Sequence, residues 1–314
     1  MTHAAWGAWM GARPWGAAPP AVAGLPRRVL VAGCGDVGTA AGLLLTAAGV
    51  DVVGLRRDPS GLPPAITPLA ADLDDPASLA GLPDVDAVIL AAAPDGRTVD
   101  AYARCYLAGP RAVLDALPRP PDRVVLTSTT AVYAQVDASK VDEDSPTEPS
   151  DETAQLVLAG EHELARRCGE NAVALRIAGI YGPGRLRLIE QVAAGREVCG
   201  HPDPWTNRVH RDDVATAIVT ALGLAAPAPR YVVVDDAPTR RCKVLNWLAA
   251  ELGVERPPRS FQPARNRGGN KRCSNARLRA TGWAPQYPDF SAGYPALLAE
   301  FLARAEMAPS AGGL

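Results

Sequence analysis

A glycine-rich turn between an apolar run and an amphipathic stretch constrains this chain more than any other feature. The apolar run over residues 28–32 leads into Gly33-Cys34-Gly35-Asp36-Val37-Gly38, which has the spacing G-x-G-x-x-G. Apolar residues then recur at helical spacing, at Val37, Ala40, Ala41, Leu44, Leu45 and Ala48, before Gly49. The motif is weak alone, but its place between a predicted strand and a predicted helix, ahead of a second strand over 50–55, makes it specific.

Each glycine of this turn has a distinct physical role. Gly33 permits the tight turn, Gly35 lets the backbone approach a pyrophosphate, and Gly38 lets the helix pack close to the strand. The start of the helix adds unpaired N–H groups and the positive end of its dipole. We therefore expect a dinucleotide to bind at Gly33, Cys34, Gly35, Asp36, Val37 and Gly38.

The residues after the second predicted strand indicate which dinucleotide binds. An acidic residue at this point would bond the ribose 2′-hydroxyl of NAD, whereas an arginine accommodates the 2′-phosphate of NADP. The chain has Arg56 and Arg57 here, with Asp58 immediately beyond. The sequence therefore favours NADP. NAD remains the alternative, because two arginines can also be solvated surface residues beside a reoriented Asp58.

Strands and helices alternate along the first two thirds of the chain. Further strands are predicted over 66–73, 86–93, 123–127 and 172–177, and helices over 99–117 and 152–168. This alternation is typical of a doubly wound parallel α/β sheet, the NAD(P)-binding Rossmann fold. Cofactor contacts are also expected where the third and fourth strands end, at Asp72, Leu73, Ala91, Ala92 and Ala93.

The C-terminal third is richer in glycine and proline and its pattern is irregular. It is predicted to hold helices over 212–222, 241–252 and 292–305 and a strand over 231–234. We expect a Rossmann domain over 25–180 and a smaller substrate-binding lobe, with elements returning to the sheet, over 181–305. Residues 1–24 are predicted to be a disordered extension and 306–314 a tail.

Bulk composition excludes several classes of function. The net charge of −2 supplies no basic surface for nucleic acid, and no apolar stretch approaches the ~20 residues that span a bilayer. The N-terminus lacks the pattern of a signal peptide. The six cysteines are scattered without metal-ligand spacing, so we expect free thiols in the cytoplasm and no metal site.

Three further motifs follow the glycine turn in a recognisable order. They are Ser128-Thr129-Thr130-Ala131-Val132-Tyr133, Arg176-Ile177-Ala178-Gly179-Ile180-Tyr181-Gly182-Pro183-Gly184-Arg185 and Asn207-Arg208-Val209-His210-Arg211-Asp212-Asp213-Val214-Ala215. Over about residues 27–305 the chain resembles the extended short-chain dehydrogenases/reductases, which include the NAD-dependent epimerase/dehydratase family. It is most similar to the atypical bacterial YeeZ-like subgroup. The resemblance implies a small-molecule substrate of the nucleotide-sugar type and, by analogy, a homodimer.

The resemblance also implies a catalytic pattern, which this chain keeps only in part. In the family a Ser or Thr orients the substrate, and a Tyr-x-x-x-Lys pair moves the proton because the lysine lowers the tyrosine pKa. Thr129 or Ser128 would fill the first role. The register of Glu161 places Thr153 and Val157 where the tyrosine and lysine would stand. The usual proton-transfer pair is therefore absent.

Two other residues are candidates for the missing proton transfer. Tyr133 lies beside the expected crevice, although this position is commonly structural, and His210 titrates in a suitable range, although it is more often a packing residue. Substrate contacts are expected from Tyr181, Arg185, Asn207, Arg208, Lys271 and Arg272, with a turn role for Tyr181 and a solvated loop around 265–272 as alternatives.

Two functions remain open. The first is an NAD(P)-dependent epimerase/dehydratase- or reductase-like enzyme with a non-standard proton relay through Thr129. The alternative is a non-catalytic NADP-binding redox sensor or protein-partner module. The retained Thr129 and Tyr133 favour the enzyme, whereas the absent tyrosine–lysine pair favours the sensor.

Overall fold

A computed structural model describes residues 24–261 and 269–307 of the chain. The predicted N-terminal extension lies outside the described residues apart from Gly24. Residues 265–268 of the loop predicted around 265–272, and residues 308–314 of the predicted tail, also lie outside them.

The central element is a seven-stranded sheet with the order β12-β7-β5-β4-β1-β2-β3. Its neighbouring strands all pair in parallel. The strands are β1 (Arg28–Ala32), β2 (Asp51–Arg56), β3 (Thr67–Ala70), β4 (Ala87–Leu90), β5 (Arg123–Thr129), β7 (Ala172–Ile177) and β12 (Arg230–Val233). The predicted doubly wound parallel sheet is thus confirmed.

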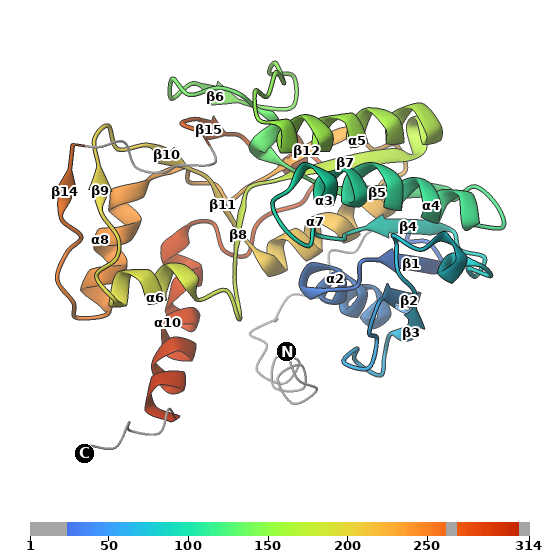
Figure 1. The fold of residues 1–314 in the computed structure, drawn as a ribbon, viewed down its shortest axis with the longest axis horizontal. Coiled ribbons are helices and arrows are strands. Elements are labelled where there is room, and N and C mark those ends of the chain that lie inside the picture. The colour runs from blue at the N-terminus through green and yellow to red at the C-terminus, as the bar shows by residue number, and fades with distance from the viewer. Residues whose placement is uncertain (1–23, 262–268, 308–314) are drawn as a thin grey trace.

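Helices cover both faces of this sheet (Figure 1). On one face α2 (Asp36–Ala47) packs against α7 (Arg211–Gly223), and on the other α3 (Val99–Ala103) packs against α5 (Glu152–Cys168). Apart from the exposed edge strand β3, the strands between them are mostly buried, as expected for parallel strands covered on both sides. The carboxyl ends of the strands therefore form the one edge of the sheet where a ligand crevice can open.

The helical stretch expected over 99–117 is interrupted. It consists of α3, a π-helical turn over Arg104–Ala108, and α4 (Gly109–Ala116). Within the turn the Gly109 N–H bonds the Arg104 carbonyl, so the backbone carries the wider ring of a π-helix. Such turns are frequent at functional sites.

A smaller lobe, whose segments lie on both sides of β12 in sequence, has its own apolar core. It is built on α6 (Arg187–Ala193), α8 (Arg241–Glu251) and α10 (Phe290–Met307), whose buried side chains meet in one cluster. Four short strand pairs lie outside the central sheet: β6 (Lys140–Val141) with β15 (Arg272–Cys273), β8 (Gly179–Tyr181) with β11 (Arg208–His210), β9 (Cys199–Gly200) with β14 (Arg259–Ser260), and β10 (Trp205–Thr206) with β13 (Thr239–Arg240). The short helix α9 (Ala276–Arg279) precedes α10.

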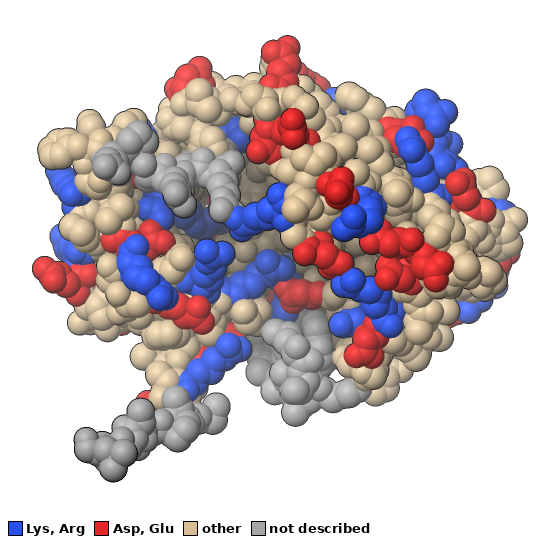
Figure 2. All heavy atoms as spheres, viewed as in Figure 1, with Lys and Arg blue, Asp and Glu red and all other residues tan. Residues whose placement is uncertain are grey.

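Figure 2 shows Lys and Arg side chains gathered along the furrow between this lobe and the sheet domain. None of the helices among the described residues combines the length and apolarity needed to cross a bilayer.

Candidate cofactor cleft and active site

The glycine turn between β1 and α2 is packed too tightly for side chains at two of its positions. Gly33 has φ +86°, and a Cβ there would lie 2.3 Å from the Ala92 backbone nitrogen. A Cβ on Gly38 would lie 2.8 Å from the Gly33 carbonyl oxygen. A Cβ on Gly35, by contrast, would meet nothing within 4 Å. The turn therefore holds strand and helix together and leaves open space in front of Gly35, where a phosphate group of a ligand can approach the protein backbone.

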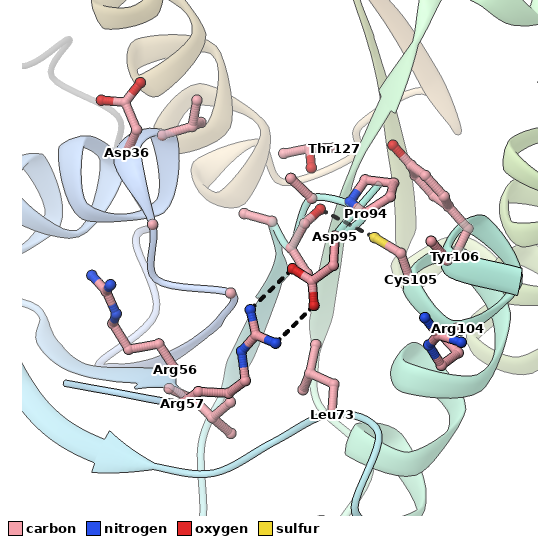
Figure 3. Close-up of a pocket in the computed structure, with 18 of the residues that line it drawn as sticks. Asp36, Arg56, Arg57, Leu73, Pro94, Asp95, Arg104, Cys105, Tyr106 and Thr127 are labelled. Carbon is pink, nitrogen blue, oxygen red and sulfur yellow. Dashed lines mark hydrogen bonds and ion pairs between the residues drawn. The ribbon is translucent and has the colours of Figure 1, made fainter. Parts of the chain in front are cut away.

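This open space belongs to a cleft of about 670 Å³ along the carboxyl edge of the sheet (Figure 3). Of the residues expected to bind cofactor, the cleft is lined by Gly33, Gly35, Asp36, Val37, Arg56, Arg57, Asp72, Leu73, Ala91, Ala92 and Ala93. Cys34 and Gly38 do not line it. Cys34 is fully buried, and burial raises the pKa of its thiol to about 11, so this thiol is a packing group.

The end of the cleft at β2 carries an ion pair that spans it. Asp95 lies in the segment after β4. Its carboxylate accepts two hydrogen bonds from Arg57, of 2.7 and 3.0 Å (Figure 3). Arg104 pairs with Asp74 at 3.0 Å. The Arg56 side chain makes no hydrogen bond or ion pair with any residue in the described ranges. Arg56 is thus available to a bound anion.

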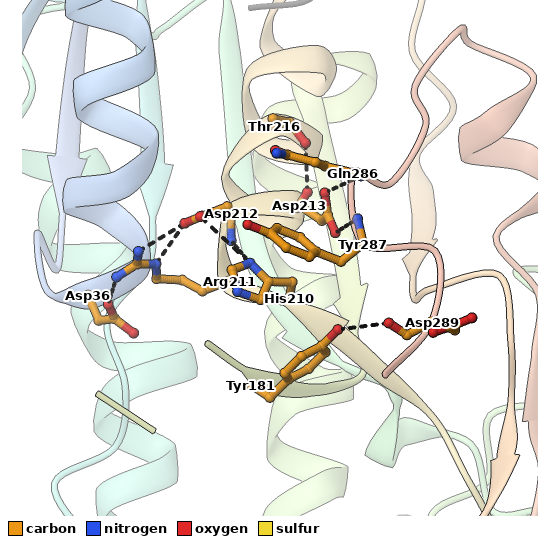
Figure 4. Close-up of polar contacts among 10 residues, drawn as sticks. All are labelled: Asp36, Tyr181, His210, Arg211, Asp212, Asp213, Thr216, Gln286, Tyr287 and Asp289. Carbon is orange, nitrogen blue, oxygen red and sulfur yellow. Dashed lines mark hydrogen bonds and ion pairs between the residues drawn. The ribbon is translucent and has the colours of Figure 1, made fainter. Parts of the chain in front are cut away.

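Asp36 connects the glycine turn to the C-terminal part of the chain. Its carboxylate accepts hydrogen bonds of 2.9 Å from both Arg185 and Arg211. Arg211 is fully buried and also pairs with Asp212, as Figure 4 shows. Arg185, an expected substrate residue, lines the same cleft as the glycine turn. The two arginines offset the negative charge of Asp36 beside the helix N-terminus.

At the opposite end of the cleft, Ser128 and Thr129 close strand β5. The Thr129 hydroxyl accepts a hydrogen bond from the Ala131 N–H at 3.2 Å, and its own proton meets no acceptor among the described residues. Ser128 donates to Glu161 at 2.5 Å. Thr129 is therefore the hydroxyl of this pair that can orient a ligand oxygen.

Glu161 lies in a buried ion pair behind this end of the cleft. Arg176 from β7 donates to it from both Nε and Nη2, the latter at 2.7 Å, and the two side chains are almost fully buried. Arg176 also donates to the Tyr133 hydroxyl at 3.0 Å. The chain Ser128–Glu161–Arg176–Tyr133 thus satisfies four polar groups in the interior.

The structure does not bring the two expected proton-transfer residues to the cleft. Tyr133 is 2% exposed and does not line it, and burial raises the pKa of its phenol to about 12. His210 is 3% exposed and caps α7, because its Nδ1 accepts the Asp212 N–H at 3.2 Å (Figure 4). Burial lowers the pKa of His210 to about 3, so the imidazole is neutral. The geometry gives both residues structural contacts.

Most of the expected substrate residues are likewise held by local contacts away from the cleft. Lys271 is 1% exposed and donates to the Tyr133 carbonyl at 2.8 Å, and Asn207 bonds the backbone of 271 and 273. Arg208 donates to Thr206, and Arg272 to the Ala138 carbonyl. Tyr181 donates to the Asp289 carbonyl at 3.3 Å and stacks on Tyr294. Of the six, Arg185 alone lines the cleft.

Sequence reasoning missed several residues that do line the cleft. Among them are Asp95, after β4, and Arg104, Cys105 and Tyr106 on the π-helical turn. A signal for Tyr106 was present, because Tyr102 and Tyr106 are four residues apart on a predicted helix and so share one face. Their rings stack with centroids 5.8 Å apart.

Comparison with known proteins agrees with this geometry. The model of the NAD dependent epimerase/dehydratase family matches residues 29–234, which include the whole cleft. The chain belongs to this family.

Individual relatives extend the match over nearly their whole length. The Escherichia coli protein YeeZ is 27% identical over 281 residues, which is 84% of this chain and 97% of YeeZ. A candidate NAD-dependent epimerase/dehydratase of Methylobacillus flagellatus is 35% identical, with a TM-score of 0.75 over 88% of this chain and 99% of its own. The human epimerase family protein SDR39U1, solved with NADPH, shares the fold at 22% identity and a TM-score of 0.66, covering 85% and 97%.

Within this epimerase/dehydratase fold, the start of α5 differs from the pattern that the sequence resemblance implies. Thr153 bonds Asp151, the residue that caps α5 at the Ala154 N–H. Val157 is fully buried in the main apolar core. A lysine at position 157 would have to extend from apolar packing, which the valine side chain suits. The residues described contain no cluster of three or more potential metal ligands.

Proposed function

We propose that this member of the epimerase/dehydratase family is an NADP(H)-dependent enzyme that reduces or oxidises a small carbonyl or hydroxyl compound, nucleotide sugars included. One observation carries the proposal. A single cleft has Arg56 and Arg57 at one end and Ser128 and Thr129 at the other. A dinucleotide laid along it would have phosphate-binding guanidinium groups at its adenosine end and a free hydroxyl at its nicotinamide end.

The residues of the turn suit a dinucleotide. The open space before Gly35 and the N-terminus of α2 can receive a pyrophosphate, with Arg185 beside them. Arg56 would bind the 2′-phosphate, because its side chain has no partner among the described residues and a guanidinium group binds phosphate well. A bound nicotinamide supplies or accepts a hydride. Thr129 would then orient the substrate oxygen by donating a hydrogen bond from its hydroxyl group.

The alternative is a non-catalytic NADP-binding sensor or partner-binding module. The buried Val157 favours this reading, because no cation stands where the family's lysine would lower a tyrosine pKa. Loss of a positioned acid–base group costs roughly 10²–10⁴-fold in rate. Both functions need the cofactor, and they differ in turnover.

Two measurements separate the functions. Titration calorimetry with NADPH and NADH tests the cofactor site. If neither dinucleotide binds, both proposed functions are overturned. NADPH oxidation is then followed across nucleotide sugars and small aldehydes and ketones, in wild type and Thr129→Val. Turnover that falls in Thr129→Val supports the enzyme, whereas tight binding without turnover of any compound favours the sensor.

A further inference from the structure

The π-helical turn over Arg104–Ala108 places a tyrosine in the cleft. Tyr106 lines the same cavity as Ser128 and Thr129, and Figure 3 shows its ring extending from the helix into that cavity. Its hydroxyl makes no hydrogen bond with any residue of the ranges 24–261 and 269–307. A phenol in this position is free to bond a ligand.

Packing against α5 holds Tyr106 in place. A Cβ on Gly160 would lie 2.5 Å from the Tyr106 carbonyl oxygen and 3.2 Å from the Tyr106 Cβ, so only glycine lets the two helices approach this closely. Tyr106 also stacks on Tyr102 and packs, like the buried Val157, in the main core cluster. The side chain is therefore anchored at its base and open at its hydroxyl.

The other protic groups at this end of the cleft are less suited to proton transfer. Ser128 commits its proton to Glu161, and Thr129 is an aliphatic alcohol that does not ionise in the physiological range. The Cys105 thiol donates to the Ala92 carbonyl at 3.4 Å, so its proton is already committed to a protein acceptor. Tyr106 is the remaining acidic hydroxyl, and it reaches the cleft from a different helix than the family's tyrosine would.

We propose that Tyr106 is the proton donor of this enzyme, taking the place of the tyrosine that α5 lacks. This inference rests on the proposed function. In the reductive direction, a bound reduced nicotinamide would supply hydride to the substrate carbonyl carbon, and the carbonyl π pair would move to oxygen. That oxygen would take the phenolic proton as the Tyr106 O–H bond breaks. Water entering the open cleft then returns a proton to the phenolate.

The surroundings of Tyr106 favour this direction. Burial raises the pKa of its phenol, and neighbouring Cys105, Tyr102 and Glu161 act in the same sense. The hydroxyl thus keeps its proton at neutral pH, as a donor in the reductive direction must, and the same shift leaves little phenolate to accept a proton in the oxidative direction.

Fluorine NMR tests the position of Tyr106 without a known substrate. The seven tyrosines are replaced biosynthetically by 3-fluorotyrosine, and the Tyr106 signal is the one missing from Tyr106→Phe. Each signal is recorded at neutral pH with saturating NADP⁺ or NADPH. We expect the chemical shift of the Tyr106 signal to differ between the two cofactor states, because the oxidised ring would place a positive charge beside the phenol. Tyr102→Phe, one turn away and outside the cleft lining, is the matched control and should leave this difference intact.

Kinetics provide a second readout. Tyr106→Phe should lower kcat for NADPH-dependent carbonyl reduction by about 10²-fold or more, while the Kd for NADPH changes less than about twofold. Tyr102→Phe should retain both values. A Tyr106 signal that ignores the cofactor's redox state, or full turnover by Tyr106→Phe, would overturn this inference alone. Absence of NADPH binding by wild type would instead overturn the proposed function.

Discussion

Arg57 and Asp95 face each other across the cleft and form a two-pronged ion pair, although they are 38 positions apart in sequence. Both side chains are more than half exposed, so the pair is solvated and screened. An anion bound at this end of the cleft would compete with Asp95 for the Arg57 guanidinium. Arg56, next to it, has no such competitor among the residues described.

Cofactor preference should follow Arg56. We expect wild type to bind NADP(H) more tightly than NAD(H), because both arginines favour a 2′-phosphate and no acidic side chain replaces them at the end of β2. Arg56→Asp should weaken NADPH binding by about tenfold or more and narrow or reverse the preference. Titration calorimetry with both cofactors decides this. Arg166→Gln, exposed on α5, is the control, and equal affinities in wild type would contradict the prediction.

Removing the competitor should have the opposite effect. Asp95→Asn frees Arg57 while keeping the shape of the side chain, so NADPH affinity should rise about threefold to tenfold. NADH affinity should change much less, because NADH lacks the 2′-phosphate. The gain should shrink at high salt, which screens exposed charges. An equal gain for both cofactors would show that Asp95 acts by some means other than competition for Arg57.

The buried ion pair between Glu161 and Arg176 should dominate stability at this end of the sheet. Glu161→Ala leaves a fully buried guanidinium without its carboxylate, which is expected to cost about 3–5 kcal/mol of unfolding free energy. Denaturant unfolding at constant m-value measures this. Glu163→Ala removes two solvated ion pairs, with Arg111 and Arg166, two residues along the same helix and should have little effect. A similar cost for both variants would mean that burial of the first pair is energetically unimportant.

Acid stability should depend on His210. Its pKa is lowered to about 3 by burial, with Arg211 adding to the effect, from an ordinary value of 6.5. The unfolded chain binds a proton there below about pH 6.5 and the folded chain does not, so the His210 contribution to stability falls as pH drops from 6.5 towards 3. The slope of this contribution approaches about 1.4 kcal/mol per pH unit. The carboxyls of Asp213 and Asp235, whose pKa values burial raises to about 7 and about 8, contribute in the opposite sense over part of this range.

The variant His210→Asn isolates this effect. Asparagine is a good helix cap, so the acceptor for the Asp212 N–H is kept while the titrating group is removed. Relative to this variant, wild type should lose unfolding free energy as pH falls from 6.5 towards 3, whatever the absolute stability of either protein. His162→Asn, at an exposed position of α5, should keep the wild-type slope. Parallel slopes for wild type and His210→Asn would contradict the assignment.

The glycine turn, the strands and the cofactor end of the cleft were accessible from the sequence because their determinants are local. A glycine that must adopt φ +86° at Gly33 is visible within its own turn, and an apolar run such as 87–90 indicates a parallel strand without knowledge of its neighbours. Arg56 follows its strand directly, so its place at the cleft follows from the position where β2 ends.

The roles of Tyr133, His210 and Lys271 could not be obtained in this way, because burial is a property of packing between distant segments. Lys271 is enclosed by contact with Tyr133, 138 positions earlier, and so cannot act as a surface cation. Tyr106 is the opposite case, because packing brings it to the cleft. It lies on a π-helical turn, which the sequence pattern did not predict, and α5 approaches this turn closely at Gly160.

The sequence by itself determined the fold class, the family and the turn that receives a dinucleotide, because backbone conformation and apolar periodicity are written in neighbouring residues. Only the tertiary structure decided which polar side chains reach the cleft. It set Asp95 opposite Arg57, joined Asp36 to Arg211 across 175 positions, and left the Tyr106 hydroxyl facing open space. The physical reason is that a side chain's exposure and partners depend on elements that the chain brings together only when it folds.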